Sequence, residues 1–89
     1  MIKISFSSSF KKAFKKKIRN NIGLEEKFWN KIEIFQNDPY DPVLKTHKLS
    51  GKLKDLWSFR LDYDIRVIFF FSDNNEALFI DIGAHREIY

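Results

Sequence analysis

The sequence predicts an α+β domain in which one strand and two helices precede an antiparallel meander of three strands (β-α-α-β-β-β). Three observations support this order. Apolar and polar residues alternate over residues 2–6, apolar residues recur every three or four positions over residues 10–35, and three strand-like runs occupy residues 57–82. A chain of 89 residues accommodates one domain, so residues 1–89 are expected to form a single unit.

The first strand and helix follow directly from the apolar spacing. Ile2, Ile4 and Phe6 lie on one face of the expected strand, and the serines of residues 7–9 then offer side chains that can cap a helix. An amphipathic helix is expected next, ending near residues 20–23, where Asn and Gly tolerate a left-handed cap. Its apolar positions are Phe10, Ala13, Phe14 and Ile18.

A second helix is expected to pair with the first as a helical hairpin. Its apolar positions are Leu24, Phe28, Ile32 and Phe35. It should stop before Pro39, because proline disfavours helical geometry in the preceding residue. Residues 38–56 are expected to be irregular.

The last three strands are expected over residues 57–62, 65–71 and 77–82, with turns at Tyr63 and between Asn74 and Asn75. Placing the apolar residues of all three strands on one face fixes the register. The expected cross-strand pairs are Leu61–Ile65, Phe59–Val67, Arg60–Arg66, Phe69–Ile80, Val67–Ile82, Phe70–Phe79 and Ile68–Asp81.

This register gives the meander two different faces. The face expected to pack against the helices carries Trp57, Phe59, Leu61, Ile65, Val67, Phe69, Phe71, Leu78, Ile80 and Ile82. The outer face is expected to carry Ser58, Arg60, Arg66, Ile68, Phe70, Phe79 and Asp81. Like charges directly opposite each other destabilise a hairpin, so the arginine pair indicates an anion, or the acid Asp62 or Asp64, between them. The apolar part of this face indicates a protein partner.

The composition narrows the classes of function. The net charge of +4 favours an anionic partner and is unevenly distributed: residues 1–20 carry six Lys and one Arg with no acid. The absence of cysteine excludes disulfides, thiolate metal sites and cysteine nucleophiles, and fits a reducing compartment such as the cytoplasm. No apolar run is long enough for a membrane span, and the basic start lacks the apolar core of a secretory signal. No cofactor motif or metal-ligand spacing is present.

Several residues suit chemistry on a phosphodiester. His85 can move a proton near neutral pH, an arginine can stabilise charge on phosphate, and Tyr89 can stack on a base. Two candidates have a simpler alternative, because a surface histidine is often incidental and Asp64 suits a turn. Basic residues that can contact RNA surround Gly51, namely Lys48, Lys52 and Lys54. A further basic set on the first helix either binds phosphate or is simply solvated: Lys11, Lys12, Lys15, Lys16 and Arg19.

Two segments resemble the RelE/ParE toxin superfamily, and its YafQ and RelE/StbE branch most of all. They are H-K-L-S-G-K-L-K-D-L-W-S-F-R-L-D-Y-D-I-R-V-I-F over residues 47–69 and I-D-I-G-A-H-R-E-I-Y over residues 80–89. The resemblance covers the whole chain and implies the toxin of a type II toxin–antitoxin pair. Such toxins cleave mRNA on the ribosome without a metal, by attack of the ribose 2′-hydroxyl on the adjacent phosphate.

The resemblance also implies residue roles. His85 matches the family's C-terminal catalytic histidine, Tyr89 its terminal aromatic, and Arg66 its strand arginine. Asp64 and His47 match an acidic catalytic position and a loop histidine of the YafQ branch. Where that branch has a second histidine, this chain has Arg60, which stays protonated and suits phosphate binding. The base is then His85, Asp64 or His47.

The family offers two other functions. ParE-type toxins share the fold but inhibit gyrase, and typically lack the terminal His and Tyr that this chain has as His85 and Tyr89. A degenerate member would bind only its antitoxin. The expected partners are a cognate antitoxin, the ribosome and mRNA. The antitoxin is expected either on the first helix or across the outer-face apolar residues Ile68, Phe70 and Phe79.

Overall fold

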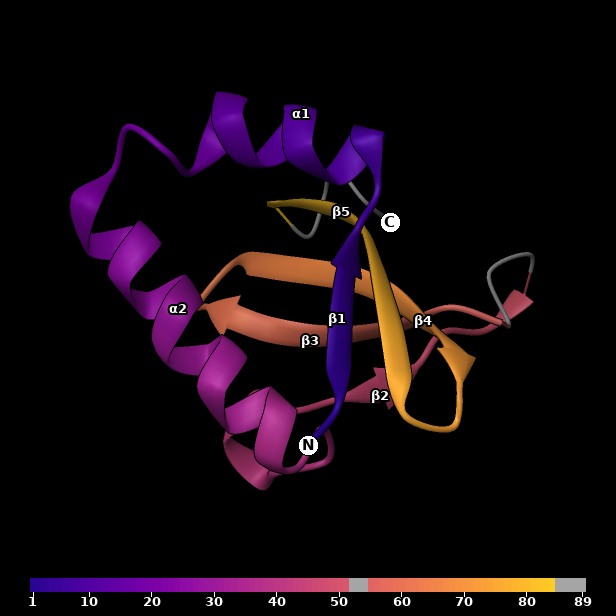
Figure 1. Cartoon of the computed structure of the whole chain (residues 1–89). Coiled ribbons are helices and arrows are strands. Elements are labelled where there is room, and N and C mark those ends of the chain that lie inside the picture. The colour runs from indigo at the N-terminus through magenta and orange to yellow at the C-terminus, as the bar shows by residue number, and fades with distance from the viewer. Residues whose placement is uncertain (52–54, 85–89) are drawn as a thin grey trace.

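A computed structural model of the chain describes residues 1–51 and 55–84 (Figure 1). Over these residues a five-stranded sheet has the order β1-β5-β4-β3-β2. The elements are β1 (Lys3–Phe6), α1 (Ser8–Lys17), α2 (Ile22–Asn37), the 3-10 turn η1 (Pro42–Leu44), β2 (His47–Lys48), β3 (Trp57–Asp62), β4 (Ile65–Asp73) and β5 (Glu76–Ala84).

The sheet is mixed, and its topology confirms the predicted fold class. Strands β3, β4 and β5 form the expected antiparallel meander, while β1 pairs with β5 in parallel. Two short elements within residues 38–56 were not predicted, η1 and β2. Strand β2 is only two residues long and has no periodicity of its own to reveal it, because it is defined by its pairing with β3.

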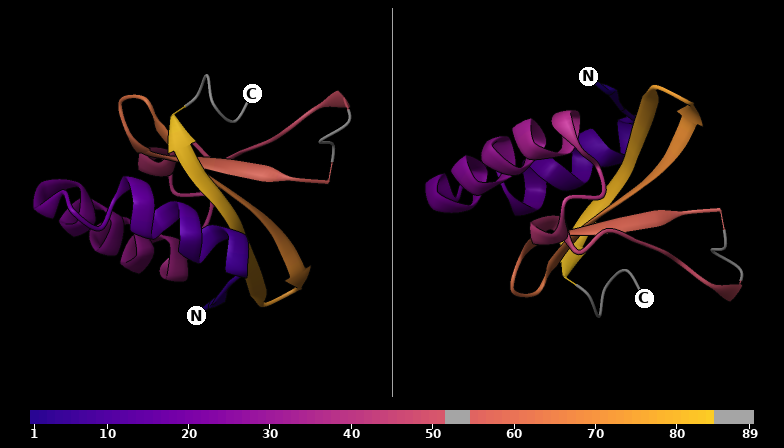
Figure 2. Two further views of the ribbon diagram at one scale, coloured as in Figure 1. Left: turned by 90° about the horizontal axis from the view of Figure 1, so that it is seen from above. Right: turned by 90° about the horizontal axis from the view of Figure 1, so that it is seen from below.

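Both helices cover the same face of the sheet (Figure 2). Helix α1 is capped by Ser7, whose Oγ accepts a hydrogen bond from the backbone N–H of Phe10 at 3.0 Å. Helix α2 is capped by Asn21, whose Oδ1 accepts from the N–H of Leu24 at 3.1 Å. It ends at Asn37, so the predicted stop before Pro39 is confirmed. The opposite face of the sheet is called the outer face below.

The core between helices and sheet consists largely of phenylalanine. Phe79 of β5 is fully buried at its centre. Its ring centroid lies 5.4 Å from that of Phe35, 5.7 Å from that of Phe59 and 5.9 Å from that of Phe69. These contacts join α2 to all three strands of the meander, so the core positions the strands that carry the candidate site.

The first hairpin follows the predicted register only in part. The pairs Phe59–Val67 and Arg60–Arg66 are confirmed. The pair Leu61–Ile65 is wrong, because Asp62 lies opposite Ile65 and leaves Leu61 as an extra residue on β3. This bulge shortens the turn to two residues.

The second hairpin contains a bulge that changes which side chains are buried. The turn at Asn74 and Asn75 and the pairs Val67–Ile82 and Ile68–Asp81 are confirmed. The predicted pairs Phe69–Ile80 and Phe70–Phe79 are wrong. Phe69 lies opposite Phe79 and Phe70 opposite Leu78, so β5 holds one extra residue, Ile80, between Phe79 and Asp81.

One extra residue reverses the alternation of side chains along a strand. Phe79 therefore enters the core, and the prediction that it lies on the outer face is wrong. Leu78 and Ile80 were expected in the core but lie outside the core cluster. The bulge is bonded to α1, because Ser9 Oγ donates to the Ile80 carbonyl oxygen at 2.7 Å.

Candidate functional site

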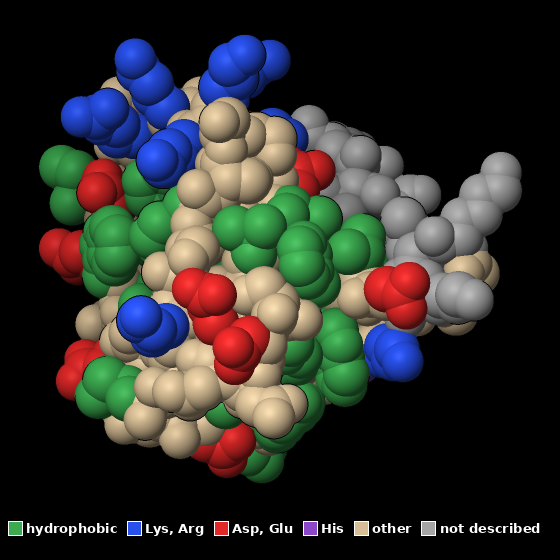
Figure 3. Space-filling view, turned by 45° about the vertical axis from the view of Figure 1, so that its right-hand side comes forward, with side chains coloured by type: hydrophobic (Ala, Val, Ile, Leu, Met, Phe, Trp, Pro, Cys, Tyr) green, Lys and Arg blue, Asp and Glu red, His purple; other side chains and the backbone are tan. Residues whose placement is uncertain are grey.

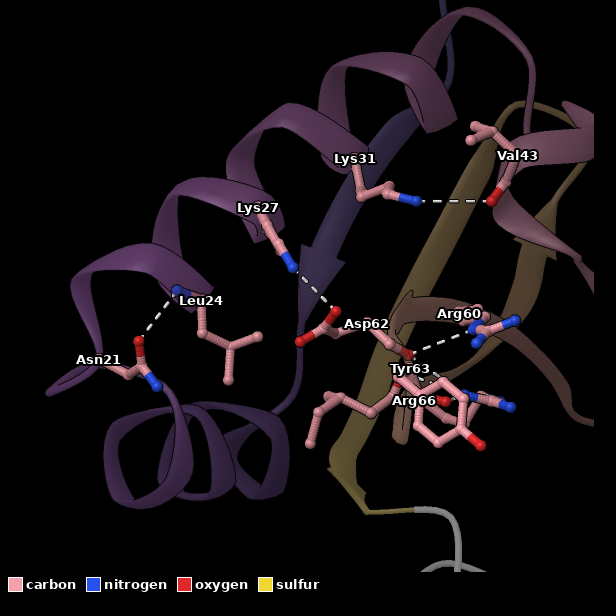
Figure 4. Close-up of polar contacts among 10 residues, drawn as sticks. Asn21, Leu24, Lys27, Lys31, Val43, Arg60, Asp62, Tyr63 and Arg66 are labelled. Carbon is pink, nitrogen blue, oxygen red and sulfur yellow. Dashed lines mark hydrogen bonds and ion pairs between the residues drawn. The ribbon is translucent and has the colours of Figure 1, made fainter.

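Two arginines face each other on the outer face, at the end of the sheet where β3 turns into β4. Arg60 Nε donates to the carbonyl oxygen of Asp62 at 3.4 Å, and its guanidinium carbon lies 5.4 Å from the ring centroid of Tyr63. Arg66 Nη1 donates to the carbonyl oxygens of Tyr63 at 3.3 Å and Asp62 at 3.4 Å. The turn thus holds both guanidinium groups together (Figure 4).

The sequence left open whether an anion or an acid, Asp62 or Asp64, lies between the two arginines. Neither Asp62 nor Asp64 forms an ion pair with them among the described residues. The Asp62 carboxylate instead accepts a hydrogen bond from Lys27 Nζ of α2 at 2.9 Å (Figure 4). This bond, assisted by the backbone N–H of Tyr63, holds the pKa of the Asp62 carboxyl below its usual value. Asp64 is exposed in the turn. Among the described residues, both guanidinium groups bond only to neutral carbonyls and remain available to an anion.

His47 lies on β2, next to this arginine pair in the register. His47 pairs with Ser58 of β3, and Ser58 pairs with Ile68 of β4, so these residues form one cross-strand row. The neighbouring row on the same face contains Arg60 and Arg66. Consecutive rows on one face are about 7 Å apart. The exposed ring of His47 has Nδ1 3.2 Å from the Lys45 carbonyl oxygen. A carbonyl only accepts, so this bond requires a proton on Nδ1 and leaves Nε2 to exchange a proton with a ligand.

Asp81 joins the same face and was not among the predicted site residues. It lies opposite Ile68, in the row that His47 begins, and is half-buried. Its Oδ1 accepts from the N–H of Ile82 at 2.8 Å. The predicted pairing of Ile68 with Asp81 already indicated this position, and the carboxylate was simply not assigned a role.

The apolar part of the outer face is smaller than expected. Phe79 is absent from it and Ile68 is only 3% exposed, so Phe70 is the partly exposed member of the predicted set. Phe70 lines a hollow of about 480 Å³ together with Lys48, Trp57 and Phe71. The structure therefore brings Phe70 next to a predicted RNA-binding lysine rather than next to Phe79.

Four of the predicted site residues lie outside the described residues: Lys52, Lys54, His85 and Tyr89. Strand β5 is described to Ala84, which lies opposite Ile65, and Gly83 lies opposite Arg66. The described chain thus ends on the strand beside the arginine pair, one residue before His85 in the sequence.

The described residues contain no group of three or more His, Cys, Asp or Glu side chains that could hold a metal ion. In that part of the chain, no helix has the length and apolar character needed to cross a membrane.

Comparison with known proteins identifies the fold. No protein-family model matches the sequence, and no curated protein matches it either. Solved structures do match. A metal-bound toxin from Helicobacter pylori is 25% identical, with a TM-score of 0.80 and full coverage of both chains. The chain has the RelE/ParE toxin fold.

Two further structures support this RelE/ParE fold over the whole chain. YafQ from E. coli is 18% identical with a TM-score of 0.74, and the match covers 100% of this chain and 99% of that chain. YoeB, in a YoeB–YefM complex from Staphylococcus aureus, is 20% identical with a TM-score of 0.76, covering 96% and 98%. The resemblance seen in the sequence motifs thus extends to the three-dimensional arrangement of strands and helices.

Proposed function

We propose that this chain is the toxin of a type II toxin–antitoxin pair and that it cleaves mRNA on the ribosome. The observation that carries the proposal is the pair of adjacent guanidinium groups, Arg60 and Arg66, bonded only to neutral carbonyls within the described residues. Two fixed positive charges on partly exposed side chains suit a phosphodiester. Fixed charge of this kind is the main means by which enzymes stabilise a phosphoryl transition state.

The proposed reaction needs no metal and balances within the RNA. The ribose 2′-oxygen loses its proton to a base and attacks the adjacent phosphorus. The bond from phosphorus to the 5′-oxygen of the next nucleotide breaks, and that oxygen receives a proton from an acid. The products are a 2′,3′-cyclic phosphate and a free 5′-hydroxyl. Arg60 and Arg66 stabilise the charge on the nonbridging oxygens.

The acid and base are drawn from His47, Asp64 and His85. His47 has Nε2 available in a position adjacent to the arginine pair. Asp64 lies in the turn between the two arginine-bearing strands. Tyr89 is proposed to stack on or orient the RNA, while Lys48, Lys52 and Lys54 are proposed to bind its backbone.

The proposed protein partner is a cognate antitoxin. Its placement across the outer face now has weaker support, because Phe79 is buried and Ile68 is nearly so. The other surface expected for it is helix α1.

The experiment is cleavage of mRNA on purified ribosomes, with gyrase-dependent supercoiling measured in parallel. We expect cleavage of ribosome-bound mRNA, loss of cleavage in the His85→Ala variant, and normal gyrase activity. Growth arrest that persists in His85→Ala, together with stalled gyrase and intact mRNA, would favour the ParE-type function instead. Antitoxin binding with neither activity would indicate a degenerate toxin.

A further inference from the structure

A polar hollow of about 460 Å³ lies between helix α2 and the turn that joins β3 to β4. Its lining combines positive charge with the aromatic ring of Tyr63. Figure 4 shows how Lys27 and Lys31 reach from α2 toward the rest of this lining. We call it the lysine hollow and define it by the basic residues that line it, Lys27, Lys31, Lys45 and Arg60.

The positive charge of the lysine hollow is not neutralised by the described residues around it. Asp62 is the one acid among the described residues of the lining, and its carboxylate is already bonded to Lys27 at 2.9 Å. In the same part of the chain, neither Lys31 nor Lys45 forms an ion pair. Lys31 Nζ donates to the Val43 carbonyl oxygen at 3.4 Å, and Lys45 is exposed. Cations brought together in this way repel one another, so the hollow favours an anion.

Tyr63 adds a flat apolar surface to this cationic site. The residue is 82% exposed, and the guanidinium carbon of Arg60 lies 5.4 Å from its ring centroid, which anchors the ring beside the hollow. Nucleobases stack on exposed aromatic rings whatever their sequence. A simple anion would use the lysines alone, whereas a nucleotide would use the lysines through its phosphate and the ring through its base.

The lysine hollow adjoins the arginine pair, because Arg60 belongs to both. Charge alone does not distinguish the hollow, since Lys and Arg side chains also gather over α1 at the top of the molecule (Figure 3). Its distinguishing feature is the shared arginine. An anion in the hollow would lie next to a phosphate held between Arg60 and Arg66, as successive phosphates of one RNA strand do.

We propose that the lysine hollow binds one nucleotide of the substrate RNA, the nucleotide next to the scissile phosphate. The phosphate of this nucleotide lies against Lys31 and Lys45, and its base stacks on Tyr63. The inference rests on the proposed function for its ligand, RNA, and adds a second site to it. Helix α2 and the residue that follows η1 then hold RNA together with the sheet.

The test measures binding of RNA that cannot be cleaved. The probe is a fluorescein-labelled tetranucleotide of 2′-O-methyl RNA, which lacks the attacking hydroxyl, and its binding to the purified full-length chain is followed by anisotropy. Adenosine monophosphate represents a free nucleotide. The tetranucleotide should bind at least about tenfold tighter than the mononucleotide, because it occupies the hollow and the arginine pair at once. Equal affinity of the two would contradict a site for an RNA chain.

A matched pair of lysine variants separates the hollow from general charge. Lys45→Gln should weaken tetranucleotide binding about fivefold and lower the slope of log affinity against log salt concentration by about 0.7, as expected for one lost phosphate contact to a single strand. Lys3→Gln removes the same charge from an exposed position on β1, at the other edge of the sheet, and should weaken binding less than about twofold. Equal losses in the two variants would mean that net charge alone attracts RNA, and would overturn the proposal.

A second pair of variants tests the stacking surface. Tyr63→Ala should weaken tetranucleotide binding at least about fivefold, and Tyr63→Phe, which keeps the ring, should bind within about twofold of wild type. Unchanged binding in Tyr63→Ala would contradict stacking. Because Tyr63 also contacts Arg60, the Lys45 variant provides the test that does not depend on that contact.

Binding and cleavage can fail separately. Tetranucleotide binding that depends on Lys45 and Tyr63, in a chain that leaves mRNA intact on ribosomes, would support the lysine hollow and contradict the proposed function. Cleavage that depends on Arg66, with tetranucleotide binding indifferent to Lys45 and Tyr63, would support the proposed function and overturn the lysine hollow.

Discussion

Lys27 of helix α2 donates a hydrogen bond to the Asp62 carboxylate at the end of β3, across 2.9 Å. Asp62 and Tyr63 provide the backbone carbonyls that hold Arg60 and Arg66. One ion pair therefore connects the helical layer to the turn that positions both arginines. Its side chains remain 55% and 41% exposed, so it contributes modestly to the free energy of unfolding.

The first prediction concerns this ion pair and pH. Asp62→Asn should lower the free energy of unfolding by about 0.5 kcal/mol at pH 7. Because Lys27 lowers the pKa of Asp62 in the folded state, the stabilisation is complete above the unfolded value of about 3.9 and disappears as pH falls through the folded pKa. Urea unfolding of both proteins should therefore differ at pH 7 and converge near the acid end.

Asp64→Asn is the control for that experiment, since Asp64 lies in the same turn and is exposed. It should change the unfolding free energy less than Asp62→Asn at pH 7. If the difference in unfolding free energy between Asp62→Asn and wild type stays constant as the pH falls below the pKa of Asp62, the carboxylate charge does not cause the stabilisation.

The second prediction tests the arginine pair in catalysis. Arg66→Ala should remove at least about 2–3 kcal/mol of transition-state stabilisation from mRNA cleavage, which is the amount typical of one lost charge-stabilising donor. That corresponds to roughly 30- to 150-fold in single-turnover cleavage on ribosomes. Cleavage within about threefold of wild type would contradict the role.

Arg66→Lys serves as a comparison in the same assay. It keeps the charge but lacks the planar set of donors that reaches two carbonyls of the turn. We expect it to recover part of the loss and no more.

The third prediction uses the run of three serines at the start of α1. Ser7→Ala should destabilise the protein by about 1 kcal/mol, because the Ser7 hydroxyl caps the N–H of Phe10. Ser9→Ala should cost a similar amount through its 2.7 Å bond to the Ile80 carbonyl. Ser8 is exposed inside α1, and Ser8→Ala should be neutral or slightly stabilising. Equal effects of all three substitutions on the thermal midpoint would refute these assignments.

The fourth prediction tests the bulge in β5. Phe79→Ala should destabilise the protein by about 3–5 kcal/mol, as expected for a fully buried phenylalanine. Phe70→Ala should cost clearly less, because Phe70 is only partly buried on the other face. Should Phe79→Ala prove too unstable to purify, Phe79→Leu against Phe70→Leu gives the same ranking by denaturant midpoint. The reverse ranking would contradict the bulge at Ile80 and support the register predicted from the sequence, in which Phe79 lies on the outer face.

The sequence alone located both helices, because their apolar spacing and the proline after Asp38 are local signals. The expected end of the first helix near residues 20–23 was wrong, because α1 ends at Lys17 and Asn21 caps the start of α2 instead. Alternation also placed Arg60 opposite Arg66, the central feature of the candidate site. It failed at Phe79, because the extra residue at Ile80 is bonded to Ser9, 71 positions away, and no local pattern reveals that contact. Strand β2 was not predicted for the same reason, because a two-residue strand is defined only by its pairing with β3.

The parallel pairing of β1 with β5 has a consequence for how the protein is made. Lys3 lies opposite Glu76, and Ser5 Oγ donates to a Glu76 carboxylate oxygen at 3.2 Å. The first strand synthesised thus pairs with the last, and contacts between such distant residues form slowly. Strand β1 therefore stays unpaired until β5 has been synthesised, while the β3–β4 hairpin with Arg60 and Arg66 can form before that.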